Sequence, residues 1–344
     1  MSERRNSLIG KILYDSFTRF TYFTPILLHN KMARNSKLLP LYKGLNKEYS
    51  YNGRTKEKNV IFSVTAETTF NMGLADRLRG VTSVYRLCKE MGVSFKLHFK
   101  VPNMIDYLEP NEYDWKIDEK DICYDTKYTY PCTLLTFHAN LNSKLQSFAQ
   151  RTILKYYINK PYQQIHVHTN MVASEKEYGK LFKELFKPTS LLQEQLDVHL
   201  PQLGGKQQYI AMVYRFRQLL GDLKDGGETL PEDQRKAYLN QAIACVEREH
   251  AKRPSDRILV TSDSKTFISR IKELSYVYTL PGEVVHMGVT TDADKMTYLK
   301  SFLDYYMLAY AHTVISVRDK KMYHSGFAYR AAKLNNAKYL EVWM

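Results

Sequence analysis

Hydrophobic and polar positions between residues 59 and 172 alternate in a way that predicts strands separated by helices. The apolar run NVIFSVTA (59–66) predicts a buried strand, and the stretch 73–92 has apolar residues at helical spacing. A second strand is predicted at SFKLHF (94–99). A strand, a helix and a strand at this spacing form a βαβ unit, which predicts a parallel sheet. A further strand is expected at 163–172 and a helix at 174–185, whereas residues 102–162 have the irregular, tyrosine-rich pattern of long loops and a helix that shape a substrate surface.

The paired glycines Gly204 and Gly205 predict a turn, after which the alternation of strands and helices resumes. We expect a domain boundary near residue 200. The predicted strands beyond it cover 209–216, 258–262, 283–287, 313–317 and 339–343, and the predicted helices cover 234–252, 265–274, 293–311 and 326–334. The chain is therefore expected to contain a basic N-terminal segment (1–58), a first α/β domain (59–200) and a second α/β domain (201–344).

Length and composition agree with two folded domains. A chain of 344 residues suits two domains of roughly 150 residues each. No apolar run approaches the ~20 residues that a membrane-spanning helix requires, and the polar first residues indicate no signal peptide, so a cytoplasmic location is expected. The cysteines show no CxxC pair and no histidine at metal-ligand spacing, which predicts buried thiols instead of a zinc site or a disulfide framework. They are Cys88, Cys123, Cys132 and Cys245.

Positive charge is concentrated at the N-terminus. The net charge is +14, and residues 1–58 hold twelve Lys and Arg against four Asp and Glu. Such a surplus favours phosphate-bearing partners. Bulky apolar residues alternate with these cations, so the segment suits an interfacial helix on the anionic inner face of a membrane. A helix packed on the protein body is the alternative, and a nucleic-acid-binding arm is not expected because no recognised binding module follows.

Candidate ligand-binding residues lie at predicted strand ends, where α/β sheets bind their ligands. In YRFRQ, Arg215 and Arg217 are two residues apart at the end of a strand, so both are expected on the same face. A guanidinium donates to two oxygens at once, which suits a diphosphate. A solvated strand edge is the alternative for this pair.

Polar residues also stand at the starts of two predicted helices. Ser325 and the backbone amides of Gly326 and Phe327 lie at a first helical turn, where an anion can be held, with a plain cap as the alternative. For the group after strand 258–262, capping is favoured over ligand binding. This group is Ser262, Asp263 and Ser264.

Acidic residues give further candidates. Asp304 interrupts an apolar and aromatic predicted helix, so it is expected to face solvent or to accept from a ligand such as a guanine amino group. Asp292 and Asp294 match the DxD pattern that holds a divalent cation on a diphosphate, although capping the helix 293–311 is preferred. In the first domain, Gly73 permits close backbone approach and Arg77 begins the helix that follows.

Taken in order along the chain, these features resemble the fucosyltransferase superfamily, most strongly its α1,2-, α1,6- and protein-O-linked branches. GLADRLRG (73–80) is similar to the helix that opens the first domain of that family, and SEKEY (174–178) to a segment of the bacterial α1,2 branch. LDYYMLAYAHTVIS (303–316) followed by SGF (325–327) completes the order. The resemblance spans residues 59–340 and implies an α/β fold of the GT-B class, with two facing Rossmann-like domains that have parallel sheets.

The resemblance assigns roles by position. The arginine on the β-phosphate of GDP-fucose corresponds to Arg217, and Arg215 stands where the family has His or Gln. The family's guanine-reading acid corresponds to Asp304 and its phosphate-contacting serine to Ser325, while its T/S-D-D segment corresponds to 262–264 without the second acid. The donor-binding residues so implied are Gly73, Arg77, Arg215, Arg217, Ser262, Asp263, Ser264, Asp304, Ser325, Gly326 and Phe327.

These correspondences imply an inverting transfer of fucose from GDP-fucose to a hydroxyl of a glycan acceptor, in the synthesis of cell-surface polysaccharide or glycolipid. Neither a metal nor another cofactor is required. The C-terminal domain would hold the donor and the N-terminal domain the acceptor, and Arg217 would neutralise charge on the departing diphosphate of an oxocarbenium-like transition state. Asp222, Glu67 or His138 could act as general base, and Asp222 is carried forward with Arg217 as a candidate catalytic residue.

Other functions stay open on the sequence alone. The same scaffold could use a different nucleotide-sugar donor. A basic, tyrosine-rich chain could instead bind RNA through stacking and phosphate contacts. A relative without catalytic activity that binds a nucleotide or a sugar is the third alternative, because the arginine motif is altered.

Overall fold

The computed structural model describes residues 57–65, 73–124, 128–134, 143–170, 175–222, 228–284, 287 and 294–344. Most of the basic N-terminal segment and the residues Glu67, His138 and Asp292 lie outside these ranges. The chain divides by its internal contacts into two compact units. Among the described residues, the first contains those within 57–65, 79–99 and 115–170, and the second those within 73–78, 100–114 and 175–344. Residues 175–199 thus group with the second unit, and the domain boundary near residue 200 stays a prediction.

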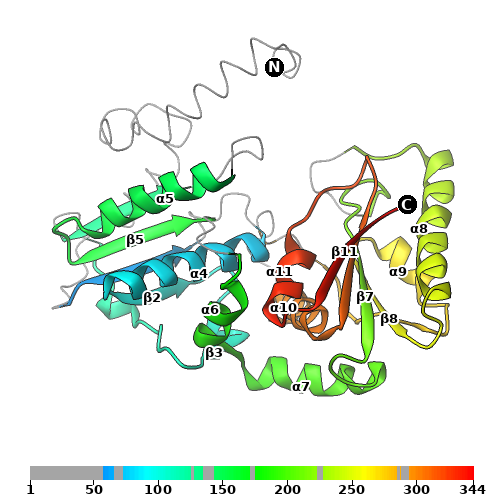
Figure 1. Cartoon of the computed structure of the whole chain (residues 1–344), viewed down its shortest axis with the longest axis horizontal. Coiled ribbons are helices and arrows are strands. Elements are labelled where there is room, and N and C mark those ends of the chain that lie inside the picture. Colours follow the sequence, from blue (N-terminus) through cyan, green and yellow to red (C-terminus); the bar gives the residue numbers. More distant parts are fainter. Residues whose placement is uncertain are drawn as a thin grey trace, which may run out of the picture. The chain divides into compact units, whose positions relative to one another are not determined.

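The first unit is built on a parallel sheet with the strand order β2-β1-β5-β4 (Figure 1). Its strands are β1 (Asn59–Val64), β2 (Ser94–Phe99), β4 (Thr129–Leu134) and β5 (Gln164–Thr169). Helix α4 (Leu74–Met91) connects β1 to β2, and α5 (Ser143–Ile158) connects β4 to β5. The predicted βαβ unit is therefore confirmed, with bounds within a few residues of those expected.

Strand β4 lies in the region that the sequence pattern predicts to be irregular. It contains Pro131, which cannot donate to a ladder and breaks the apolar run. Among the described strands β4 pairs with β5 alone, at the end of the strand order, where a proline is tolerated. Tyr130 of this strand packs on Tyr157 of α5, with ring centroids 5.2 Å apart.

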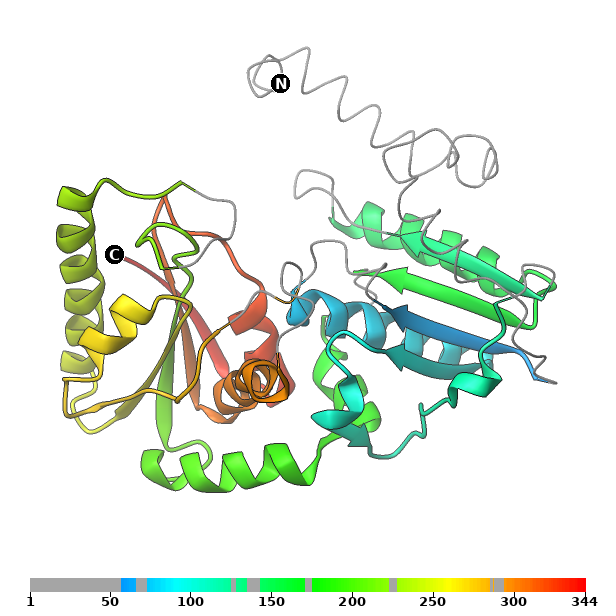
Figure 2. The same cartoon turned by 180° about the vertical axis from the view of Figure 1, so that it is seen from behind.

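The second unit contains a parallel sheet with the strand order β11-β10-β7-β8-β9. Its strands are β7 (Tyr209–Tyr214), β8 (Arg257–Ser262), β9 (Val277–Tyr278), β10 (Thr313–Arg318) and β11 (Lys338–Trp343). Helices α8 (Glu232–Ala251) and α9 (Lys265–Ile271) cover one face, and α10 (Lys295–Tyr310) and α11 (Phe327–Leu334) cover the other (Figure 1, and from behind in Figure 2).

The alternation of side chains along β7 determines which residues point into the core and which point to the opposite face of the sheet. Ile210, Met212 and Tyr214 belong to the core that includes residues of α8 and α9. Phe216, two residues beyond Tyr214, joins the same core and is fully buried. Arg215 therefore projects toward the opposite side, as strand alternation requires.

Most of the predicted elements of the second unit are confirmed, with two differences. Of the strand expected at 283–287, the described residues Glu283, Val284 and Met287 are not in a strand and the other two lie outside the described residues, and the two-residue β9 pairs with β8. The helix expected at 174–185 begins later, as α6 (Tyr178–Leu185). The remaining elements are β3 (Leu108–Pro110) paired antiparallel with β6 (Phe186–Pro188), α7 (Ser190–His199), and the short 3₁₀ helices η2 (Met104–Asp106), η3 (Glu119–Asp121) and η4 (Pro201–Leu203).

The thiols behave as predicted. Cys88, Cys123, Cys132 and Cys245 are all buried and none forms a disulfide. Burial raises the pKa of Cys88 and Cys132 well above its ordinary value. In the described ranges, no helix combines the length and the apolar character needed to cross a bilayer.

Candidate active site

A cavity of about 160 Å³ lies at the carboxyl ends of β7 and β8, and every residue that lines it belongs to the second unit. Open α/β sheets bind ligands at this end of their strands. Eight of the predicted site residues line the cavity together: Gly73, Arg215, Ser262, Asp263, Asp304, Ser325, Gly326 and Phe327. The cavity is also lined by residues that no sequence motif marks: Thr261, Val284, Met287, Ser301 and Tyr323.

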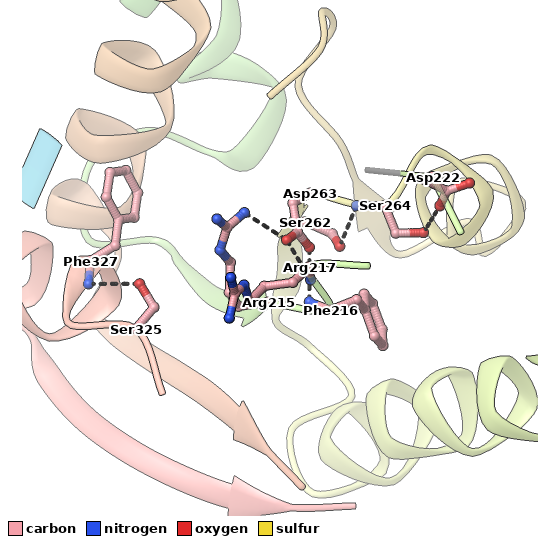
Figure 3. Close-up of polar contacts among 9 residues, drawn as sticks. All are labelled: Arg215, Phe216, Arg217, Asp222, Ser262, Asp263, Ser264, Ser325 and Phe327. Atoms are coloured by element: carbon pink, nitrogen blue, oxygen red, sulfur yellow. Dashed lines mark hydrogen bonds and ion pairs between the residues drawn. The ribbon is translucent and has the colours of Figure 1, made fainter. Parts of the chain in front are cut away.

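The carboxylate of Asp263 organises the turn that follows β7 (Figure 3). It accepts from the guanidinium of Arg215 at 2.6 Å and from the backbone N–H groups of Phe216 at 2.9 Å and Arg217 at 2.8 Å. Burial raises the pKa of Asp263, and the charge of Arg215 together with these N–H groups opposes that rise. The sequence favours a helix cap for this segment, whereas Asp263 binds the neighbouring turn instead.

The expectation that Arg215 and Arg217 share one face of a strand is wrong. Strand β7 ends at Tyr214, and Arg217 has a φ of 54°, in the left-handed region that non-glycine residues rarely occupy. In Figure 3 the side chain of Arg215 and the ring of Phe216 point in opposite directions. The guanidinium carbon of Arg217 lies 5.0 Å from the ring centroid of Tyr323, which lines the cavity. Arg215 thus lines the cavity, whereas Arg217 does not line it and contacts it only through Tyr323.

The start of α9 is capped by Ser264, as predicted. Its side chain accepts from the N–H of Phe267 at 3.1 Å. Asp222 extends the cap, because its carboxylate accepts from the hydroxyl of Thr266 at 2.6 Å, from the N–H of Thr266 at 3.2 Å and from the hydroxyl of Ser264. Neither Asp222 nor Ser264 lines the cavity.

The start of α11 presents both a cap and an open polar surface. The hydroxyl of Ser325 accepts from the N–H of Phe327 at 3.2 Å. Ser325, Gly326 and Phe327 all line the cavity, and Gly326 is exposed. The positive end of the helix dipole therefore faces the same cavity as Arg215.

Asp304 has a partner that the sequence analysis did not identify. Its carboxylate lies 2.5 Å from the ammonium of Lys300, one helical turn earlier, and both side chains are 6% exposed. Burial raises the pKa of Asp304, and the charge of Lys300 opposes the rise. Asp304 therefore does not face solvent, and it lines the cavity as one member of a buried ion pair. The i, i+4 spacing was the available signal.

Arg77 supports the cavity wall without lining it. The residue is fully buried, and its guanidinium donates to the carbonyl of Met287 at 2.8 Å and to the carbonyl of Val101. Burial lowers the pKa of Arg77 to about 10, so it is charged at neutral pH. Because Met287 lines the cavity, Arg77 fixes part of the wall.

Asp294 of the DxD pattern is the N-cap of α10, as preferred from the sequence. It accepts from the N–H groups of Met296 at 2.8 Å and Thr297 at 3.0 Å. The helix begins at Lys295, two residues later than predicted. Within the described ranges, no group of three or more His, Cys, Asp or Glu side chains is placed to hold a metal ion.

Comparisons with known proteins give structural matches. No family model matches the chain, and no curated protein matches it. A NodZ α1,6-fucosyltransferase soaked with GDP-fucose matches with a TM-score of 0.50 at 16% identity, over 81% of this chain and 93% of that chain. A variant of Arabidopsis thaliana FUT1 in complex with GDP matches with a TM-score of 0.53 at 14% identity, over 91% of this chain and 76% of that chain. At such identities the likeness concerns the fold alone, and it confirms the predicted fold: the chain has the α/β GT-B fold of the fucosyltransferases, with a parallel sheet in each unit.

Proposed function

We propose that the protein is an inverting glycosyltransferase that moves fucose from GDP-fucose to a hydroxyl of a glycan acceptor without a metal ion. The observation that carries the proposal is the cavity at which the arginine turn after β7 and the first turn of α11 meet. The likeness in fold to enzymes that bind GDP-fucose or GDP supports this choice of donor.

The diphosphate is proposed to bind between the arginines and α11. Arg215 is held in place by Asp263, so its guanidinium needs no reorganisation when a phosphate arrives. The amide of Gly326 and the hydroxyl of Ser325 add donors at the positive end of a helix, which is a common anion site. Arg77 positions the wall and does not touch the donor in this proposal.

The guanine base is proposed to bind near Ser301 and Asp304. The carboxylate of Asp304 accepts N–H donors, and Lys300 favours its ionised form. The preference for GDP over other nucleotides depends on this proposed contact between Asp304 and the base.

The transfer is proposed to follow a single displacement. The acceptor hydroxyl attacks the anomeric carbon, the bond from that carbon to the diphosphate oxygen breaks, and the hydroxyl proton passes to a base. Arg217 neutralises the charge that grows on the leaving diphosphate, an effect that is largest in the transition state. The carboxylate of Asp222 is occupied by the donors at α9, so we assign it a capping role and leave Glu67 and His138 as the proposed bases.

The acceptor is proposed to be a cell-surface polysaccharide or a glycolipid made at an anionic membrane surface. The concentration of positive charge in residues 1–58 supports this location. Deleting residues 1–40 should abolish sedimentation with vesicles of anionic phospholipid and leave sedimentation with neutral vesicles unchanged. Equal binding of both forms to anionic vesicles would refute it.

A thermal-shift titration tests the donor. GDP, GDP-fucose, GDP-mannose and UDP-sugars are added with and without Mn²⁺ to wild type, to Arg217→Ala and to Arg270→Ala, a control whose half-exposed side chain lies on α9. A ligand at 100 times its Kd stabilises the native state by about 2.7 kcal/mol. We expect GDP and GDP-fucose to stabilise wild type and the control without metal, and to have little effect on Arg217→Ala.

The other outcomes discriminate between functions. Stabilisation by UDP-sugars alone would indicate another donor. Donor binding without turnover on any acceptor would indicate an inactive relative, and indifference to all nucleotides combined with salt-sensitive RNA binding would indicate a nucleic-acid-binding protein.

A further inference from the structure

Polar and aromatic side chains that the proposed reaction does not use gather along β11. This strand stands at the end of the strand order of its sheet, beside β10 (Figure 1). Leu340 and Val342 pack against the core that includes α8. Because alternate residues point to opposite faces, Tyr339, Glu341 and Trp343 project on the face that α11 covers.

Arg318 of β10 connects these side chains. The strand register pairs Arg318 with Trp343, and its guanidinium donates to the carboxylate of Glu341 at 2.5 Å and to the hydroxyl of Tyr339 at 3.1 Å. Arg318 is only 6% exposed, and its Nε finds no hydrogen-bond partner among the described residues. The hydrogen bond from Arg318 lowers the pKa of Glu341, so this carboxylate is ionised at neutral pH.

An open aromatic surface adjoins this polar group. Trp343 is 61% exposed. Tyr329 of α11 meets the ring of Tyr339 edge-on, with centroids 5.2 Å apart. The imidazole of His324 lies 3.4 Å from the carboxylate of Glu341. We call this surface the β11 platform, which consists of Arg318, His324, Tyr329, Tyr339, Glu341 and Trp343.

We propose that the β11 platform binds a saccharide residue. A pyranose ring has an apolar C–H face, which suits the exposed indole, and a rim of hydroxyls, which both donate and accept. Glu341 is an acceptor for that rim, and the ring nitrogen of His324 that does not face Glu341 can form a hydrogen bond with a hydroxyl. Covering these polar groups with an apolar partner would leave them unsatisfied at a cost, so a polar ligand with one apolar face fits better.

The position of the platform indicates which saccharide it serves. His324 lies in the chain between Tyr323 and Ser325, and both of these line the cavity. A saccharide on the platform is therefore next to the residues that surround the proposed donor. Resting on the proposed function, the saccharide is a residue of the acceptor glycan other than the one that receives fucose. The resemblance assigns the acceptor to the N-terminal domain, and the platform adds a contact from the C-terminal domain.

Tryptophan fluorescence tests the platform directly. The chain has two tryptophans, and Trp115 is 1% exposed, so quenching by acrylamide reports mainly on Trp343. β-linked tetrasaccharides of glucose, galactose and N-acetylglucosamine are titrated in the absence of nucleotide, with sorbitol as a control. We expect at least one tetrasaccharide to change the emission saturably and to protect Trp343 from acrylamide.

Variants assign the signal to the site. Trp343→Phe should lose the response, Glu341→Gln should bind about tenfold more weakly, and Lys338→Ala on the same strand should bind like wild type. No saturable response to any tetrasaccharide, a response that persists in Trp343→Phe, or a response to anionic vesicles or RNA alone would each overturn the inference. Stabilisation by GDP is measured on the same variants. Its absence in wild type would refute the proposed donor and leave the platform standing, whereas normal GDP binding without a saccharide response would refute the platform alone.

Discussion

Asp263→Asn should destabilise the second unit and weaken donor binding together. The carboxylate binds one guanidinium and two backbone N–H groups, and its side chain is 1% exposed. One oxygen, Oδ2, accepts from both Arg215 and the N–H of Arg217. If the new asparagine keeps its amide oxygen at the Oδ1 position, its NH₂ group replaces Oδ2 and faces the two donors from Arg215 and Arg217. We expect the loss of one neutral hydrogen bond, at about 1 kcal/mol, and one charged hydrogen bond, at about 2 kcal/mol.

The expected total is therefore a fall of about 3 kcal/mol in the free energy of unfolding, less the relief of removing a buried charge. Urea denaturation followed by far-UV circular dichroism measures it. Asp118→Asn, at an exposed acid paired with Lys120, is the control and should unfold like wild type. GDP affinity should fall at least tenfold in Asp263→Asn, because Arg217 loses the contact that holds its left-handed backbone. A change in unfolding free energy below about 0.5 kcal/mol would refute the view that Asp263 organises this turn.

Three further predictions concern other parts of the molecule. Gly80→Ala should lower the free energy of unfolding by about 1–3 kcal/mol, as measured by urea denaturation, because its Cβ would stand 1.8 Å from the carbonyl oxygen of Thr169. Gly73→Ala, whose Cβ would have no atom within 4 Å, should leave the free energy of unfolding unchanged. Burial and the nearby His98 lower the pKa of His166 to about 3, so as pH falls the imidazole is protonated in the unfolded state before it is protonated in the folded state. The free energy of unfolding should therefore fall by about 1.4 kcal/mol per pH unit between about pH 6.5 and pH 3. His166→Asn should lack this contribution to the pH dependence of unfolding. Asp222→Asn should cost about 1 kcal/mol through the cap of α9 and leave turnover within about threefold, while a collapse of turnover at unchanged stability would identify Asp222 as the base.

Regular alternation of apolar runs made most of the fold predictable. β1, α4 and β2 are continuous stretches whose apolar spacing is strong, and their bounds differ little from the prediction. β4 and β9 were missed for physical reasons. Pro131 interrupts the first, and the second has only two residues, Val277 and Tyr278, so neither shows a period. The stretch 283–287 predicted a strand because it contains two consecutive valines, yet β8 pairs with β9.

The site was predictable as a set of strand ends and helix starts, but its internal contacts were not. Local spacing cannot show that Asp263 binds the turn after another strand, because that contact joins residues 46 to 48 positions apart. It also cannot show that Arg77 points to the carbonyl of Met287, 210 residues later. The pairing of Lys300 with Asp304 was within reach, since the two residues are one helical turn apart.

The burial of every thiol makes the protein well suited to site-directed labelling. An exposed thiolate attacks an alkylating reagent, whereas all four thiols here are buried, and burial also raises the pKa of Cys88 and Cys132. A single cysteine introduced at the surface should therefore be the only thiol that reacts with a labelling reagent in the folded protein. Under mild denaturant, alkylation of Cys88, Cys123 and Cys132 would report opening of the first unit, and alkylation of Cys245 would report opening of the second.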